Sequence, residues 1–190
     1  STSAGLNTFY GVYPTFINAV GNGIIYEVTT EHTITDPIYK GAMSRAINAT
    51  TGEEIWSLSS YVGEFGSMSY AIADGYNLLF NGYDDQLYTV GRGPTVATVT
   101  ASPAASTLGN NVVIQGTLVD TSSGTKQDEQ AARFPHGVPV ASDASMTDWM
   151  GYVYQQKPFP TSFTGVPVAL YVFDANGNYR SIGTTTTDGK

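Results

Sequence analysis

Apolar and polar residues alternate along most of the chain, in short runs that are interrupted by Gly, Asn, Asp and Pro. A period of two is typical of β-strands with one buried face, and the interrupting residues are those that form tight turns. In the first half, this pattern predicts seven short strands: residues 15–20, 24–30, 42–48, 54–59, 67–73, 78–81 and 86–90.

The predicted strands fall into two units of similar layout. Residues 19–26 and 71–78 share one pattern, an apolar strand, a turn rich in Gly and Asn or Asp, and a second apolar strand. The two copies begin roughly 50 residues apart, which is the length of a β-propeller blade. The first unit has four strands and the second has three, and only the N-terminal segment is left to supply the missing strand.

The second half of the chain predicts a different domain, and we place the boundary at residues 91–94, which read Gly-Arg-Gly-Pro. Two long alternating strands, 95–101 and 111–119, follow it, and such a pair opens many immunoglobulin-like (Ig-like) sandwiches. A polar, irregular segment at 121–140 comes next. Two further strands, 166–173 and 179–185, are joined by a tight turn. We therefore expect two domains, residues 1–93 and 94–190.

One helix is predicted, over residues 146–155, as an insertion near 145–156 among the strands of the second domain. Its apolar residues recur at helical spacing and form one stripe: Met146, Trp149, Met150 and Val153. Ser145 and Asp148 have the spacing of a capping box, in which each side chain bonds an amide at the helix start. The fold class predicted is thus mostly β with one inserted helix.

The charge and the composition argue against some classes of function and favour others. The net charge is −8, the chain has only 8 Lys and Arg, and no two basic residues are adjacent, which argues against nucleic-acid binding. Cys is absent, and no apolar run approaches the ~20 residues of a membrane span. The start lacks a signal peptide, as a mature or excised segment would. Many Tyr and Thr with few Lys favour an exported protein, at the cell surface or outside the cell.

Candidate chemistry is sparse. His32 and His136 are the only histidines, and they lie in different predicted domains, so we interpret both as ordinary surface residues. Glu53-Glu54 and Asp84-Asp85 are paired carboxylates on predicted turns, where solvation opposes the pKa separation that acid–base catalysis needs. We expect no catalytic residue.

No cofactor is expected, and a calcium ion is the one alternative left open, since turn oxygens and carboxylates are hard ligands. Asp174, Asn176 and Asn178 alternate as in calcium loops, but no bidentate Glu follows at the EF-hand position, and a hairpin turn explains them more simply. Asn48-Ala49-Thr50 is an N-glycosylation sequon on a predicted turn, so Asn48 is a candidate glycosylation site.

The stretch from residue 46 to residue 56 resembles the repeat of quinoprotein-type (PQQ-like) β-propellers, whose consensus is Ala-x-Asp-x-x-Thr-Gly-x-x-x-Trp. The matching residues are Ala46, Thr51, Gly52 and Trp56, while Asn48 stands where Asp is usual. The resemblance implies that Asn48, Thr51 and Gly52 shape the turn, and that Trp56 docks one blade on the turn of its neighbour.

Residues 146–156, 164–168 and 174–188 resemble the Ig-like domain of predicted archaeal surface proteins, in which this domain follows a PQQ-like propeller. The two resemblances imply the end of a propeller, about one and three-quarters blades, followed by an incomplete Ig-like β-sandwich.

These observations favour a non-enzymatic, exported cell-surface protein with a structural, adhesive or partner-binding role. Its partners would be other protein chains or cell-surface glycans. Two alternatives remain open. One is a self-assembling surface or filament subunit, a homo-oligomer completed by strand donation. The other is a fragment of a PQQ-dependent propeller dehydrogenase.

Overall fold

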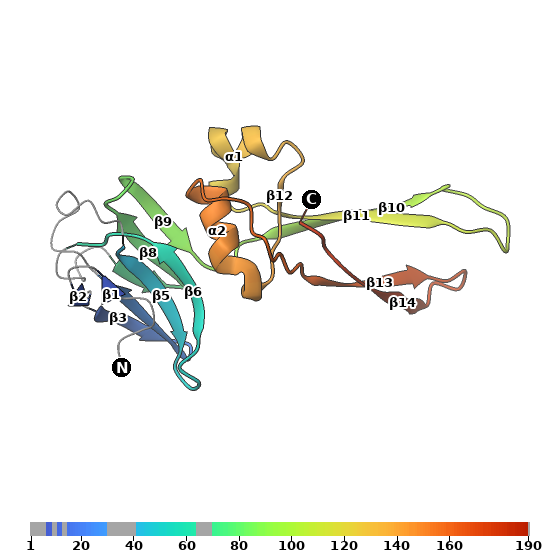
Figure 1. Cartoon of the computed structure of the whole chain (residues 1–190). Helices are drawn as coiled ribbons and strands as arrows, with labels where there is room; N and C mark the ends of the chain where they lie inside the picture. The colour runs from blue at the N-terminus through green and yellow to red at the C-terminus, as the bar shows by residue number, and fades with distance from the viewer. Residues whose placement is uncertain (1–6, 9–10, 13–14, 30–40, 64–69, 190) are drawn as a thin grey trace. The chain divides into compact units, whose positions relative to one another are not determined.

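The structure, a computed structural model, describes residues 7–8, 11–12, 15–29, 41–63 and 70–189 (Figure 1). The fold is mostly β, as predicted, and every strand pairing is antiparallel. The chain divides into two compact units, Ser1–Arg92 and Gly93–Lys190. This division falls inside the segment 91–94, where the sequence predicts the domain boundary.

The first unit contains a four-stranded sheet whose strands lie in sequence order. They are β3 (Thr15–Gly21), β4 (Ile24–Thr29), β5 (Met43–Asn48) and β6 (Glu54–Ser59). Two short strands, β1 (Asn7–Thr8) and β2 (Gly11–Val12), pair with each other.

A three-stranded sheet completes the described part of this unit, formed by β7 (Tyr70–Ala73), β8 (Tyr76–Asn81) and β9 (Gln86–Val90). Its first turn repeats that of the four-stranded sheet. Asn22 and Gly23 have φ of 51° and 73°, and Asp74 and Gly75 have φ of 51° and 81°. Two successive residues at positive φ form the tight hairpin turn that matches strand twist. Because this turn uses only two residues, β8 begins two residues earlier than predicted.

The strand β5 is buried on both faces. Ser44, Arg45 and Ala46 are consecutive, so their side chains point to alternate faces, yet all three are at most 5% exposed. On one face, the apolar residues of neighbouring strands, Val28 and Leu58, lie opposite Ser44. Burial on both faces places β5 in the interior of the unit, whereas β3 of the same sheet has exposed residues.

The second unit contains two separate sheets. In one, the hairpin β10 (Thr95–Ser102) and β11 (Val113–Asp120) is extended by the two-residue strand β12 (Val138–Pro139). The other is the hairpin β13 (Pro167–Phe173) and β14 (Tyr179–Thr186). Both hairpins were predicted. Every residue of β10 and β14 is exposed.

Two details of the predicted helical region are wrong. The segment 121–140 is not irregular throughout, because it contains a 3-10 helix (Ser123–Lys126) and α1 (Asp128–Arg133). The predicted helix is present as α2 (Met146–Tyr154), but Ser145 does not form a capping box with Asp148. A 3-10 turn (Asp143–Ser145) leads directly into α2, and the Ser145 hydroxyl instead accepts a hydrogen bond from the Thr164 amide at 2.7 Å.

The core of the second unit forms around α2. Val138, Ala141, Trp149 and Val153 are buried together, and aromatic rings pack against them, including Phe134, Tyr152 and Phe163. Trp149 and Val153 belong to the apolar stripe that the sequence predicts. Of the described residues, none lies in a helix long and apolar enough to cross a membrane.

Candidate functional site

The turn between β5 and β6 is held by the Asn48 side chain. Its Oδ1 accepts hydrogen bonds from the amides of Thr50 at 2.9 Å and Thr51 at 3.1 Å. The Asn48 carbonyl also accepts a bond from the Gly52 amide at 2.8 Å, and Gly52 has φ of +75°. The side-chain oxygen and the carbonyl of Asn48 therefore hold this turn together.

This turn lies beside the turn of the neighbouring hairpin. The Ala49 amide donates a hydrogen bond to the Gly23 carbonyl at 2.8 Å, which joins the two turns at one end of the sheet. Residues 49–53 are all exposed, and the Thr51 hydroxyl is 3.2 Å from a carboxylate oxygen of Glu53. At this end of the sheet, backbone hydrogen bonds therefore join the two turns, and residues 49–53 are open to solvent.

Trp56 lies opposite Ala46 in the β5–β6 pairing, and its ring lies near the ring of Tyr26 in the same sheet. The Tyr26 ring centroid is 6.3 Å from that of Trp56 and 6.3 Å from that of Tyr70, which belongs to the three-stranded sheet. Burial raises the pKa of Tyr70, whose hydroxyl accepts a hydrogen bond from Asn77. These rings lead from one sheet to the next, and docking of Trp56 on a neighbouring turn stays a prediction.

Asn81, at the end of β8, joins the two sheets through hydrogen bonds. Its Oδ1 accepts bonds from the amides of Tyr61 at 3.0 Å and Tyr83 at 3.1 Å, and its Nδ2 donates to the Ser59 carbonyl at 3.3 Å. The Tyr83 hydroxyl accepts a further bond from the Ala42 amide at 2.9 Å. Because Asn81 is 1% exposed, these bonds form away from water, where a lost partner is costly.

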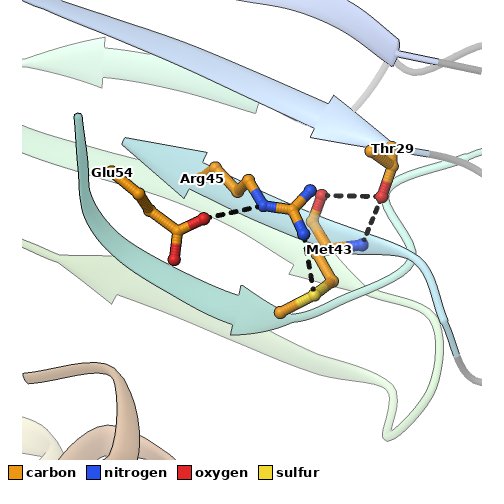
Figure 2. Close-up of polar contacts among 4 residues, drawn as sticks. All are labelled: Thr29, Met43, Arg45 and Glu54. Carbon is orange, nitrogen blue, oxygen red and sulfur yellow. Dashed lines mark hydrogen bonds and ion pairs between the residues drawn. The ribbon is translucent and has the colours of Figure 1, made fainter. Parts of the chain in front are cut away.

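Arg45, which is 5% exposed, is the only charged residue among the buried residues that the structure describes, and it lies in a polar cluster with Glu54, Met43 and Thr29 (Figure 2). Its Nε donates to Glu54 Oε2 at 2.9 Å and its Nη2 lies 3.3 Å from the Met43 sulfur. Thr29 Oγ1 accepts a bond from the Met43 amide at 2.9 Å at the edge of this cluster. Arg45 Nη1 is buried with no hydrogen-bond partner among the described residues.

A β-bulge creates the Arg45–Glu54 pair. In a regular strand, Glu54 and Trp56 would lie on the same face, since side chains alternate with a period of two. The pairing shifts between Ala46 and Ile47, so that Trp56 faces Ala46 while Glu54 faces Ile47. The extra residue moves the Glu54 carboxylate to the face of Arg45, where it neutralises the buried guanidinium.

The candidate catalytic and metal groups do not converge in the described part of the chain. His136 is exposed, and His32 lies outside the described residues. Asp84 Oδ1 accepts a bond from the Gln86 amide, and its Oδ2 accepts one from the Tyr88 hydroxyl at 2.6 Å. Within residues 15–29, 41–63 and 70–189, no group of three or more His, Cys, Asp or Glu side chains could hold a metal ion.

The proposed calcium-like loop is the turn of the β13–β14 hairpin. Asp174 Oδ1 accepts bonds from the amides of Asn176 at 2.8 Å and Asn178 at 2.9 Å, and Oδ2 accepts one from Asn178 Nδ2. The hydrogen bonds from Asn178 hold the pKa of the Asp174 carboxyl below its usual value. Both oxygens of the carboxylate thus shape the turn, as the hairpin interpretation expects.

Sequence reasoning missed the contact between α1 and the C-terminal end of α2. Arg133 donates hydrogen bonds to the carbonyls of Val153 at 3.0 Å and Tyr152 at 2.8 Å, and its guanidinium lies 4.8 Å from the centroid of the Tyr152 ring. Gln130 donates to the Val153 carbonyl at 3.0 Å. A Glu129–Arg133 pair at helical spacing is the signal that could have revealed α1.

Comparison with known proteins adds no identification. No protein-family model, curated protein or solved structure matches the chain.

Proposed function

We propose that this chain is part of a non-enzymatic, exported cell-surface protein with a structural or adhesive role. The observation that carries the proposal is the uncharged strand β10, in which every residue is exposed, in a unit that contains two hairpins. Its partners would be other protein chains or cell-surface glycans.

The two hairpins present apolar side chains to solvent. Val99 is 68% exposed and Val113 is 59% exposed on the first hairpin, and Phe173 and Tyr179 are 69% and 62% exposed on the second. The strand β10 contains only Thr, Val, Ala and Ser. Exposed apolar groups on a strand without charged residues are typical of surfaces that contact another molecule.

The charged groups of the described residues support a structural role. Arg45 pairs with Glu54, and Arg133 pairs with Glu129 and with helix carbonyls. Asp174 bonds to the amides of its own turn. Each of these groups stabilises the fold, which is the role expected of charged residues in a structural protein.

For the architecture, we propose that the two sheets of the first unit are consecutive propeller blades and that the second unit is Ig-like. The sequence order of the strands β3–β6, the repeated tight turns and the bonds of Asn81 between the sheets support the first assignment. The two long hairpins of the second unit support the other.

Labelling of intact cells tests the proposed location. An antibody against the folded chain should label unpermeabilised cells of the source organism, and external protease should remove the signal. A cytoplasmic marker labelled in parallel is the control for intact cells. Labelling that needs permeabilisation would overturn the proposal.

The open edges of the hairpins favour a second candidate, self-assembly by strand donation. Both edges of the β13–β14 hairpin and the outer edge of β10 are unpaired among the described residues. Val99→Lys would place a charge on β10 and block pairing there, while Val99→Thr would keep a neutral strand former. Sedimentation at increasing concentration should show oligomers for the parent and Val99→Thr, and fewer oligomers for Val99→Lys, in which only the edges of the β13–β14 hairpin remain open. A parent that stays monomeric at all concentrations would refute strand donation.

A further inference from the structure

We propose that Asn48 is an N-glycosylation site, in which a glycan is attached to Nδ2 at the exposed end of the four-stranded sheet. The inference rests on the proposed export of the chain, since transfer from a lipid-linked sugar donor takes place outside the cytoplasm. It assigns a chemical role to Asn48-Ala49-Thr50 beyond the shaping of the turn.

The turn presents this sequon in a defined geometry. The hydrogen bonds given for the Asn48 side chain are accepted by Oδ1, from the amides of Thr50 and Thr51 at 2.9 and 3.1 Å. These two bonds fix the plane of the side-chain amide and use only its oxygen. The nitrogen, which is the acceptor atom in N-glycosylation, is not part of the bonds that hold the turn.

Access to the turn is also favourable. Asn48 is partly buried, but the next four residues, 49–52, are all exposed, including the Thr50 that the sequon requires. A Cβ added at Gly52 would meet no atom within 4 Å, so there is open space beside the backbone here. A transferase could therefore approach Asn48 and Thr50 from the solvent side of the turn.

The modification is compatible with the folded turn. The donor is an oligosaccharide linked through its first carbon, C1, to a lipid pyrophosphate. The Asn48 Nδ2–C1 bond forms and the C1–O bond breaks, so that the electron pair of that bond leaves with the lipid pyrophosphate, and one Nδ2 proton passes to a base of the transferase. The product remains an amide, so Oδ1 still accepts both turn bonds and one N–H remains.

Transfer to the purified, folded chain in vitro tests this site independently of export. The reaction contains an oligosaccharyltransferase, a lipid-pyrophosphate-linked oligosaccharide and the full chain. A synthetic peptide covering residues 46–52 serves as a positive control. Mass spectrometry of the peptide that contains Asn48 measures the modified fraction.

The variants separate chemistry from folding. Asn48→Asp keeps an oxygen for the turn bonds and removes the acceptor nitrogen, and Thr50→Val removes only the hydroxyl at nearly constant volume. We expect modification of the parent and of Thr50→Ser, and its loss in Asn48→Asp and Thr50→Val. A folded parent that stays unmodified while the control peptide is modified would overturn the proposal, as would equal modification of Thr50→Val. The in vitro result depends on the turn alone, whereas surface labelling of cells tests export alone.

Discussion

Replacing Asn81 by Ala should weaken the joining of the two sheets of the first unit. The substitution removes three hydrogen bonds at once: those from the Tyr61 and Tyr83 amides, and the one to the Ser59 carbonyl. At about 1 kcal/mol of net stabilisation for each bond, the loss would be about 3 kcal/mol. The Nδ2 bond is long, at 3.3 Å, so we expect a loss of about 2–3 kcal/mol.

Tryptophan fluorescence can report on this unit alone. The chain has two Trp residues, Trp56 in the first unit and Trp149 in the second, so a Trp149→Phe background leaves Trp56 as the only Trp. Urea unfolding followed at Trp56 should show a lower midpoint for Asn81→Ala. The slope with denaturant should not change, since the surface exposed on unfolding stays nearly the same.

A matched control distinguishes lost bonds from a lost contact surface. Tyr83→Phe removes only the hydroxyl that accepts a bond from the Ala42 amide, and we expect it to cost about 1 kcal/mol. A destabilisation below about 0.5 kcal/mol for Asn81→Ala would refute the reasoning, because it would mean that water replaces the three bonds at little cost. The same result would remove one of the observations that support adjacent blades.

Three further predictions concern the turns and the helix contact. Gly52→Ala should destabilise the first unit by about 1 kcal/mol in the same unfolding assay, because an L-residue is strained at φ +75° even though the space beside it is open. Arg133→Lys should lower the free energy of unfolding by about 1–2 kcal/mol when unfolding is followed at Trp149. The reason is that a single ammonium cannot reproduce the guanidinium bonds to two helix carbonyls. An unchanged midpoint would contradict this prediction. The pKa of the Asp174 carboxyl lies below its usual value of 3.8. The stabilisation of the hairpin turn by the ionised carboxylate is therefore fully present above pH 3.8, and it is lost as the pH falls through the lower pKa of the folded state. The amide resonance of Asn178 should shift in that acid range, and Asp174→Asn should abolish the shift.

Much of the local structure could be predicted from the sequence because it depends on neighbours in the chain. The Asn-Gly and Asp-Gly turns at Asn22 and Asp74 adopt the positive φ values that these residues tolerate, so the hairpins around them form as expected. The apolar stripe of α2 placed Trp149 and Val153 in the core for the same reason, since it repeats at helical spacing.

The errors arose where a distant residue competes for a local group. Ser145 has the sequence context of a helix cap, but its hydroxyl is used by the Thr164 amide, 19 residues later. The helix α1 has only 6 residues, too few for periodicity to identify it, and its contact is with the carbonyl ends of α2. Neither partner can be recognised before the chain folds.

The sequence by itself determined that the protein is mostly β and where its tight turns approximately lie, and it predicted a division near residues 91–94. These properties follow from strand periodicity and from the φ preferences of Gly, Asn and Asp, which act within a few residues. Only the tertiary structure decided that a bulge brings Glu54 to the buried Arg45 and that Asn81 bonds the two sheets together. The physical reason is that a buried polar group must have a hydrogen-bonding or charged partner, because burial removes its contact with water. Which groups are buried depends on the whole fold. At the turn between β5 and β6, local preference and tertiary contact agree: Asn48 shapes the turn from within, and Ala49 ties it to the neighbouring one.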